Sequence, residues 1–378
     1  MNKISIIGGG IGGLALATSL QHFKIPYQLY ETASSLGEIG AGIGISESTV
    51  EILNSLGLGK LLSEKGRYVK DAIIVDSKCA IIKKLPIENG GFCVHRMDLI
   101  DILRKNIPDE NLHLNYKLSS YTKTENCIEL LFENGETIKT EFLFVADGIN
   151  SKIRQHLYPQ IKKRYSGQTI WRGIADIDLP INYQNAYLEF WGHNLRFATI
   201  PLNDKQYYWY AVQEAKEGEK DNVKTLKTDL QKLFANHVSE ISQVIEHTKT
   251  IIRNDMFDLK PHNFNWYNDK IVFIGDAIHA TTPNLAQGGC QAIEDAFYLS
   301  ALISKYGLIE QTFTKYQHNR IKKVNYIVKQ SWRFGKIAHS KSKIADWIVQ
   351  KVFRFLPKSY FIKQYKRLID ISYIKTII

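Results

Sequence analysis

The sequence predicts an α/β fold in which a domain built on a mixed sheet is interleaved with an antiparallel β-sheet domain and followed by C-terminal helices. Three observations support this prediction. Residues 3–31 read as strand, glycine-rich turn, helix and strand. Residues 165–260 are rich in aromatic residues and poor in glycine, which is typical of an antiparallel sheet with one covered face. Residues 299–336 and 342–369 have helical patterns.

The N-terminal stretch carries a binding motif. Gly8, Gly10 and Gly13 satisfy G-x-G-x-x-G after a predicted strand, and a second strand ends on Glu31. In a Rossmann-like unit these glycines make the turn, let the backbone approach a pyrophosphate, and let helix and strand pack closely. Glu31 can accept hydrogen bonds from both ribose hydroxyls but would repel a 2′-phosphate, which disfavours NADP at this site. The motif therefore predicts a dinucleotide site and leaves FAD and NAD as alternatives.

A second strand–loop–helix stretch lies at residues 271–296. Its apolar strand leads into a tight Gly275-Asp276 turn, and the loop that follows contains Pro283 and the pair Gly288-Gly289. A helix is predicted to begin near Gln291. An acid at a strand tip and glycines before a helix N-terminus favour a polar or anionic ligand.

Two more polar side chains stand at strand–helix junctions. Arg96 is predicted just before an amphipathic helix, and it could form a surface ion pair or reach a ribityl hydroxyl or phosphate. Asp147 follows a strand in an Asp-Gly pair, and it could brace the turn or bind a ribityl or phosphate group through water. Arg154, on the next helix, could likewise serve a phosphate or lie on the helix surface.

Composition limits the class of protein. The chain has 378 residues and 44% hydrophobic residues, which is typical of a globular protein of two or three domains. Its four cysteines are scattered without a C-x-x-C pair, which argues against a disulfide framework or a metal site and predicts a reducing, cytoplasmic location. No apolar run approaches the roughly 20 residues that span a bilayer.

The positive charge is concentrated at the C-terminus. Residues 301–378 contain 17 Lys and Arg against 3 Asp and Glu, a net of +14, so residues 1–300 carry 11 − 14 = −3. A solvated helix face or a weak attraction to anionic membrane surfaces or polyanions would explain this surplus. One apolar stripe, suited to packing on the body or to lying on a membrane, accompanies it: Ile344, Trp347, Ile348, Val352 and Phe355.

Four motifs occur in the order known from one enzyme family. They are GGGIGG with Glu31, HRMDL at 95–99, ADGINSKIR at 146–154 and GDAIHATTPNLAQGGCQAIEDA at 275–296. The set resembles the class A FAD-dependent monooxygenases of the para-hydroxybenzoate hydroxylase fold, over residues 1 to about 330. The last motif and Trp171-Arg172-Gly173 look most like the urate hydroxylase, salicylate hydroxylase and zeaxanthin epoxidase branch.

The resemblance implies cofactor roles for the matching positions. FAD would be the bound cofactor and NAD(P)H a transient co-substrate. The ADP half of FAD would be held by Gly8, Gly10, Gly13 and Glu31, and the rest of it by Arg96, Asp147 and Asp276. The helix N-terminus would point at the flavin, and the wall where oxygen reacts would be formed by Pro283, Gly288 and Gly289.

The same resemblance implies two catalytic residues on the aromatic-rich sheet, which offers a pocket for a flat substrate. Arg196 and Tyr208 match, by their spacing from Pro201, a functional Arg and Tyr of urate hydroxylase. They share a sheet face only if the hairpin loop between them has an odd number of residues; an even loop without a bulge would separate them. Arg196 could hold an anionic substrate, and we assign His279 a structural or flavin-adjacent role rather than that of a base.

The function implied is hydroxylation of an aromatic or heteroaromatic small molecule with NAD(P)H and dioxygen, through a flavin hydroperoxide. The alternatives are an epoxidase, an antibiotic-inactivating monooxygenase of the tetracycline type, a flavin reductase or dehydrogenase without oxygenation, and a non-catalytic flavoprotein at a membrane surface. We expect no nucleic-acid partner and no metal, and a monomer or a homodimer.

The motifs also predict a discontinuous domain organisation. The FAD-binding domain would comprise residues 1–70, 96–160 and 266–300. The substrate-binding sheet domain would comprise residues 71–95 and 161–265, and the C-terminal helical segment residues 301–378.

Overall fold

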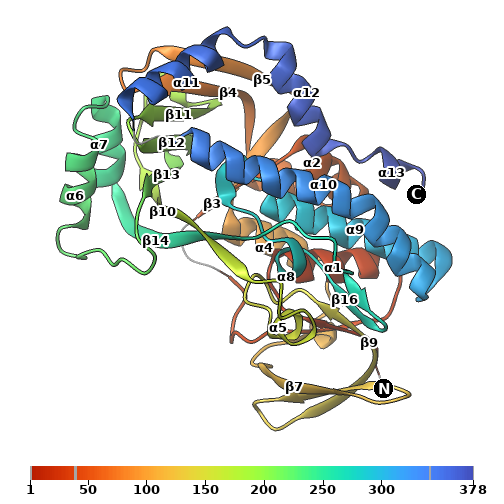
Figure 1. The fold of residues 1–378 in the computed structure, drawn as a ribbon. Helices are drawn as coiled ribbons and strands as arrows, with labels where there is room; N and C mark the ends of the chain where they lie inside the picture. The colour runs from red at the N-terminus through yellow and green to blue at the C-terminus, as the bar shows by residue number, and fades with distance from the viewer. Residues whose placement is uncertain (1, 38–40, 340–341, 378) are drawn as a thin grey trace.

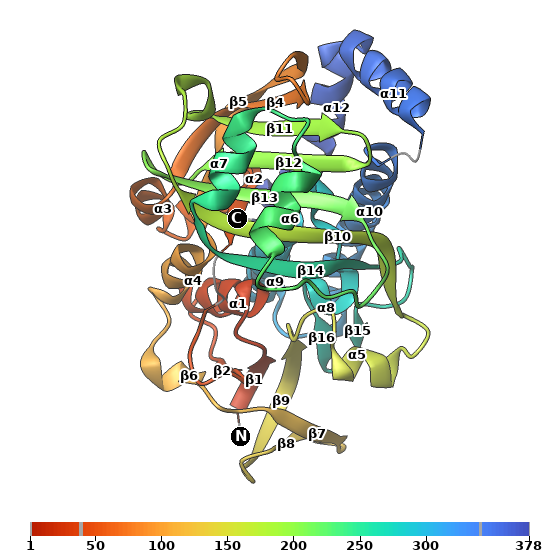
Figure 2. The same cartoon turned by 90° about the vertical axis from the view of Figure 1, so that its left-hand side faces the viewer.

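The computed structural model describes residues 2–37, 41–339 and 342–377. Two eight-stranded sheets form its framework, and helices cover them (Figures 1 and 2). The predicted α/β fold, with one mixed sheet and one mainly antiparallel sheet, is confirmed.

The first sheet is mixed and has the path β15-β16-β9-β1-β2-β6, with β8 and β7 extending from β9. Pairs β1–β2, β1–β9, β9–β16 and β2–β6 are parallel, and the others are antiparallel. Its strands are β1 (Asn2–Ile7), β2 (Gln28–Tyr30), β6 (Leu112–His113), β7 (Leu118–Lys123), β8 (Ile128–Phe132), β9 (Thr137–Val145), β15 (Tyr267–Asn268) and β16 (Ile271–Phe273).

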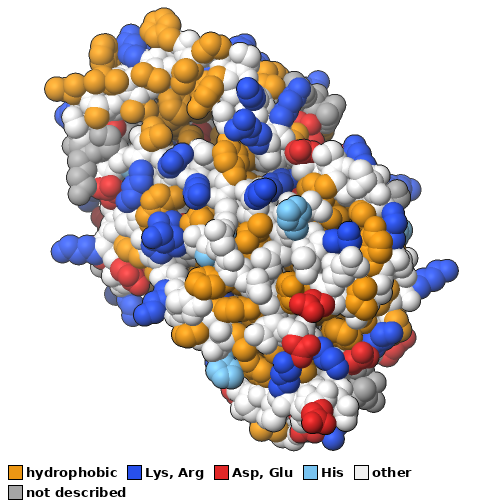
Figure 3. Space-filling model, turned by 45° about the vertical axis from the view of Figure 1, so that its right-hand side comes forward, with side chains coloured by type: hydrophobic (Ala, Val, Ile, Leu, Met, Phe, Trp, Pro, Cys, Tyr) orange, Lys and Arg blue, Asp and Glu red, His pale blue; other side chains and the backbone are white. Residues whose placement is uncertain are grey.

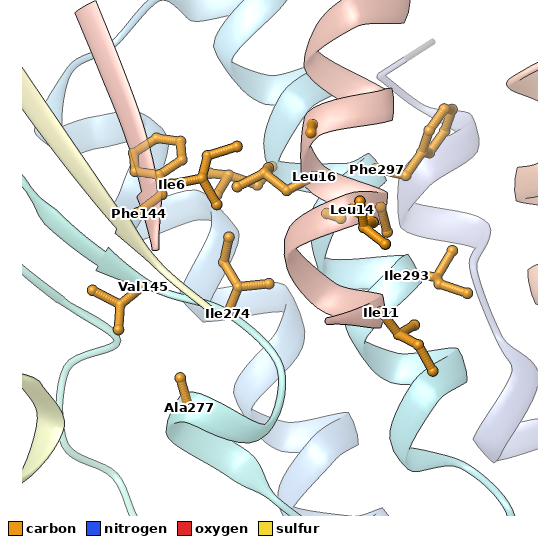
Figure 4. Close-up of a cluster of buried hydrophobic side chains, with 14 of the residues drawn as sticks. Ile6, Ile11, Leu14, Leu16, Phe144, Val145, Ile274, Ala277, Ile293 and Phe297 are labelled. Atoms are coloured by element: carbon orange, nitrogen blue, oxygen red, sulfur yellow. The ribbon is translucent and has the colours of Figure 1, made fainter. Parts of the chain in front are cut away.

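The core of this region lies between the first sheet and two long helices, α1 (Ile11–His22) and α9 (Gly288–Tyr306). Figure 4 shows Ile6 and Phe144 of the central strands facing Leu16 of α1, while Leu14 and Ile293 pack between the two helices. The carboxyl-terminal parts of the two central strands, residues 4–7 and 142–145, are buried and mostly apolar, as expected for parallel strands that are covered on both faces.

The second sheet has the order β14-β10-β13-β12-β11-β4-β5-β3, and only its β11–β4 pair is parallel. Helices α6 (Leu226–Leu233) and α7 (Ser239–Glu246) cover one face (Figure 2). The strands are β3 (Gly42–Ile45), β4 (Arg67–Asp76), β5 (Ile81–His95), β10 (Lys163–Asp176), β11 (Ala186–Gly192), β12 (Leu195–Pro201), β13 (Gln206–Glu214) and β14 (Thr248–Leu259).

The remaining helices connect or cover the two sheets. The shorter ones are α2 (Glu47–Ser55), α3 (Gly59–Lys65), α4 (Arg96–Arg104), α5 (Lys152–Leu157), α8 (Asp276–His279) and the 3₁₀ turns η1 (Asp109–Asn111), η2 (Ile181–Tyr183) and η3 (Pro283–Leu285). The C-terminal ones are α10 (Glu310–Ile337), α11 (Lys343–Phe355), α12 (Lys358–Ile369) and α13 (Ser372–Lys375). Within the described ranges, no helix is both long and apolar enough to cross a membrane.

Three predicted boundaries differ from the structure. The helix expected near Gln291 already begins at Gly288, and Arg96 is the first residue of its helix instead of standing before it. The helix expected over residues 299–336 is broken at Gly307, which has φ of 81° and terminates α9.

The strand pairing also bears on the predicted domains. β4 begins at Arg67 and so crosses the boundary expected at residue 70, while β3 pairs with β5 of the second sheet. The domain division stays a prediction.

Candidate active site

The three motif glycines differ in their surroundings. Gly8 has φ of 105°, and a Cβ built there would lie 2.5 Å from the Ala146 carbonyl oxygen. A Cβ on Gly13 would lie 1.8 Å from the Gly8 oxygen, so helix α1 and strand β1 approach too closely for any side chain. Gly10 has no atom within 4 Å of that position and leaves the backbone open to a ligand. Turn, packing and open approach are the features a pyrophosphate site requires.

Glu31 is held at the carboxyl end of β2. The backbone N–H groups of Gly9 and Ala33 donate to its two carboxylate oxygens, the second over 2.8 Å. These bonds fix the carboxylate beside the glycine turn, where it can accept from a ribose. This arrangement fits the ADP end of FAD.

The second glycine-rich stretch forms a tight turn that is followed by the N-terminus of a long helix. Gly275 adopts φ of 58°, and Asp276 follows it with an exposed side chain at the start of α8. Helix α9 begins at Gly288, and the side chain of its N-cap residue Gln287 makes no capping hydrogen bond, which suits a helix N-terminus that receives an anionic or polar ligand. A Cβ on Gly289 would lie 2.8 Å from Ile43 of β3, which places this helix end against the second sheet.

Asp147 and Arg154 have different environments. Burial raises the pKa of Asp147 to about 6, although a hydrogen bond with Ser151 acts in the opposite direction. Its Oδ1 is buried without a protein partner among the described residues, which fits an acceptor for a cofactor hydroxyl. Arg154 is buried and donates to the carbonyls of Ala277, over 2.8 Å, and Ile149, over 2.6 Å. It therefore braces α5 against α8.

The register of the second sheet brings Arg196 and Tyr208 to one face. Ile200 pairs with Tyr208 and Pro201 with Tyr207, so five residues, 202–206, lie between the partners of the last register pair. The odd number satisfies the condition stated above, and Arg196 lies on the same face as Ile200.

Arg196 joins this face to the loop before α9. Its side chain is 1% exposed, its Nη1 donates to Glu189 Oε1 over 3.2 Å, and its Nη2 donates to Asn284 Oδ1. Asn284 lies in η3, next to Pro283. The guanidinium is therefore ion-paired inside the protein, at the wall expected to border the flavin.

Glu189, a buried acid beside Arg196, is a candidate site residue that sequence reasoning missed. Its Oε1 also accepts from Trp191 Nε1 over 3.1 Å, and its Oε2 accepts from the hydroxyls of Tyr187 and Tyr210, the latter over 3.1 Å. The two tyrosine oxygens are 2.5 Å apart. The sequence does contain one indication of this residue. Side chains alternate along a strand, so Tyr187, Glu189 and Trp191 share one face, and the pairing of Trp191 with Arg196 makes this the face of Arg196.

Tyr208 lies against the neighbouring strand β3. A Cβ on Gly42 would come within 2.5 Å of its ring, so only glycine leaves room for the ring there. Burial raises the pKa of Tyr208 to about 12, opposed by the charges of Arg172 and Arg96. Tyr208 thus keeps its proton at neutral pH, and Arg96 reaches the same region of the site.

His279 lies apart from this network. Its Nε2 is 2.5 Å from Asp295 Oδ2, and its ring packs on Trp266 at 4.9 Å between centroids. His279 is 6% exposed and connects α8 to α9, as expected for a residue with a structural role.

The comparisons with known proteins agree with this geometry. The FAD binding domain family model matches residues 1–331. The aurachin C monooxygenase/isomerase of Stigmatella aurantiaca is 31% identical, covering 93% of this chain and 94% of the relative. The 2-heptyl-3-hydroxy-4(1H)-quinolone synthase of Pseudomonas aeruginosa is 27% identical over 97% of each chain.

A solved structure shows the same fold. HpxO of Klebsiella pneumoniae, in complex with FAD and uric acid, superposes with a TM-score of 0.89 at 22% identity and covers 97% of this chain and 96% of its own. The chain therefore belongs to the FAD-binding-domain family, and it is an FAD-dependent monooxygenase. The resemblance to the class A enzymes is confirmed.

Proposed function

We propose that the protein uses NAD(P)H and dioxygen to hydroxylate a neutral, electron-rich N-heteroaromatic bicycle of the 4-quinolone class. The observation that carries this proposal is the ion pair of Arg196 with Glu189 on the face that meets η3. Bound FAD supplies the redox chemistry that activates dioxygen.

The ion pair bears on the charge of the substrate. Arg196 alone would attract an anion, but Glu189 lies 3.2 Å away and both side chains are almost completely buried. The pair is neutral as a whole, and an anionic substrate would add an uncompensated charge to it. A neutral ring that donates and accepts hydrogen bonds suits such a site better.

The tyrosines offer the matching hydrogen-bond groups. Tyr187 and Tyr210 both direct their hydroxyls at Glu189, and each oxygen keeps acceptor capacity for a ring N–H. Burial and the nearby Glu189 raise the pKa of Tyr210 well above its usual value, so its hydroxyl stays neutral. Tyr208, also protonated, can donate to a ring oxygen and orient the substrate.

The name of one of the two relatives supports the same substrate class. One is named for making a 3-hydroxy-4(1H)-quinolone with a heptyl chain, and the other for acting on aurachin C. Both align with more than nine-tenths of this chain. We therefore take 2-heptyl-4(1H)-quinolone as the probe.

The cofactor roles are part of this proposal. The pyrophosphate would lie at Gly10 and the adenosine ribose at Glu31. Asp147, Asp276 and Arg96 would contact the ribityl chain or phosphates, while Pro283, Gly288 and Gly289 would border the ring.

The test is product analysis with the purified holoenzyme. We expect 2-heptyl-4(1H)-quinolone to accelerate NAD(P)H oxidation and to acquire one atom of ¹⁸O from ¹⁸O₂. Oxygenation of a tetracycline in place of the quinolone, or an epoxide product, would support one of the alternative enzymes. NAD(P)H oxidation that yields only hydrogen peroxide with every candidate would favour the reductase reading.

A further inference from the structure

Helix α11 has apolar side chains on two opposite sides. On its inner side Phe353 packs edge-on against Trp191, with ring centroids 4.9 Å apart, and Val349 joins the same cluster. Asp346 adds a hydrogen bond with the His193 ring. This narrow seam fixes the helix on the second sheet and uses few of its apolar residues.

The outer side carries the larger apolar surface, which we name the α11 stripe. All five of its members are exposed: Ile344 by 73%, Trp347 by 61%, Ile348 by 49%, Val352 by 49% and Phe355 by 78%. Helical spacing places them on one side, away from the seam. Figure 3 shows hydrophobic side chains gathered at the top of the molecule, the end where Figure 1 places α11.

Basic side chains surround the α11 stripe. Lys343 and Arg354 of α11 are exposed, and the Lys351 ammonium lies 5.5 Å from the centre of the Trp347 ring. Lys358 and Lys363 of α12 are exposed as well. Residues 342–377 contain eight Lys and Arg but only two acids, of which Asp346 is hydrogen-bonded to His193.

We propose that α11 docks the protein on the surface of an anionic lipid bilayer, with the α11 stripe at the boundary of headgroups and acyl chains. A helix with a broad apolar side, an interfacial Trp and flanking Lys and Arg has the composition of an interfacial helix. Anionic headgroups complement the surrounding positive charge.

A second copy of the chain fits this surface less well. In a two-fold contact through the α11 stripe, Lys343, Lys351 and Arg354 of one copy would approach the same residues of the other. Like charges held together in this way oppose association. The charge around the stripe therefore favours the lipid surface as its occupant.

The docking helix also lies near the candidate active site. The end of α10, just before α11, contacts Arg196: its guanidinium carbon is 5.3 Å from the centre of the Phe334 ring. The His339 ring lies between two backbone carbonyls, with Nδ1 3.0 Å from the Gly335 oxygen and Nε2 3.2 Å from the Val212 oxygen, and its one N–H can donate to either. A bilayer at α11 would therefore lie close to the substrate sheet, where an apolar substrate dissolved in lipid would be at hand; the docking itself does not depend on the proposed reaction.

The test is flotation of the FAD-loaded full chain with vesicles of phosphatidylcholine containing about 30 mol% phosphatidylglycerol. We expect the wild type to float and the triple variant Trp347→Gln, Ile348→Gln, Phe355→Gln to partition at least about tenfold less. The matched control is Ile181→Gln, Val223→Gln, which changes side chains 75% and 88% exposed elsewhere and should float like the wild type. Unchanged FAD content will show that the triple variant is folded.

Salt and oligomeric state complete the experiment. Raising salt from about 0.1 to about 0.5 M should weaken flotation without abolishing it, because the apolar contribution is unscreened. Three results would overturn the proposal: no flotation of the wild type, equal flotation of the triple variant, or complete loss at high salt. So would a vesicle-independent dimer that the triple variant converts to monomer, since the stripe would then bind a second copy.

Discussion

Two buried arginines show how differently the two halves of this molecule use the same side chain. Arg320 uses all five of its N–H groups, on Asp295, Glu294, Tyr373 and Gln291. Arg196 uses two, on Glu189 and Asn284, and its Nε has no partner among the described residues. Both are almost completely buried.

The difference separates a structural cluster from a site with hydrogen-bonding capacity left for a ligand. Arg320 lies on α10 and connects this helix to α9 and α13. Arg196 connects the substrate sheet to η3, and its neighbours are tyrosines with free acceptor capacity. We therefore propose that the fully hydrogen-bonded Arg320 contributes to stability and that the incompletely paired Arg196 contributes to binding.

The largest effect should follow from breaking the saturated cluster. In Arg320→Met, Glu294 and Asp295 would remain buried without their main counter-charge, and the free energy of unfolding should fall by about 3–5 kcal/mol. Urea unfolding measures this change. Lys322→Met, an exposed position on the same helix, should stay within about 0.5 kcal/mol of the wild type. An equal loss of unfolding free energy in Arg320→Met and Lys322→Met would show that the Arg320 cluster does not stabilise the fold more than an exposed position does.

The next effect should be catalytic. Arg196→Gln should lower kcat/KM for the quinolone by at least about 100-fold, because the substrate face loses its link to η3. Stability should fall less than in Arg320→Met, by about 1–3 kcal/mol, because one buried acid instead of two loses its counter-charge and Trp191 and two tyrosines still donate to Glu189. The control is Arg253→Gln on the opposite face of the same sheet, where the guanidinium donates to Asp221, Glu219 and Thr169. If Arg196→Gln instead loses FAD or unfolds, Arg196 has a structural role like that of Arg320.

A smaller change should appear in substrate choice. Glu189→Gln removes the negative charge beside Arg196, so affinity for an anion such as urate should rise roughly tenfold while affinity for the neutral quinolone falls. Dissociation constants for both compounds, measured on the oxidised holoenzyme, give the comparison. If neither dissociation constant changes, the charge of the Arg196–Glu189 pair does not affect substrate binding.

The smallest effect concerns two carboxyls of the FAD region. Burial raises the pKa of Asp295, but the charges of Arg320 and His279 outweigh it and hold that pKa at about 2. Asp147 lacks such compensation, and burial raises its pKa to about 6. Between about pH 4 and 6 folded Asp147 keeps a proton that the unfolded chain has lost, so its contribution to stability declines as the pH rises.

Unfolding of the FAD-free protein across this range tests the sign. The wild type should lose about 1–2 kcal/mol more than Asp147→Asn between pH 4 and 6.5. Asp276→Asn, with its exposed side chain, is the control and should follow the wild type. A steeper decline in Asp147→Asn would contradict the assigned environment.

Sequence patterns predicted the parts of the fold that depend on local spacing. The reason for each motif glycine is found again in the structure: φ at Gly8, open space at Gly10 and close packing at Gly13. The α11 stripe was also visible as a helical period, but whether a stripe packs or faces solvent depends on elements distant in sequence, and here it faces solvent.

The substrate site was less predictable. Spacing indicated Arg196 and Tyr208, and only the hairpin register, with five residues between the partners of its last pair, put them on one face. Glu189 and Asn284 come to Arg196 from another strand and from η3, so no local signal joined the three. The carboxylate of Glu189 neutralises the positive charge of Arg196, which the sequence had suggested would hold an anionic substrate.

The most direct measurement is a titration of the oxidised holoenzyme, without NAD(P)H, with 2-heptyl-4(1H)-quinolone and with urate, following the absorbance of bound FAD. The neutral Arg196–Glu189 pair predicts that the quinolone binds at least about 100-fold more tightly than urate. Equal or tighter binding of urate would show that Arg196 acts as a free cation in the site and would contradict the account.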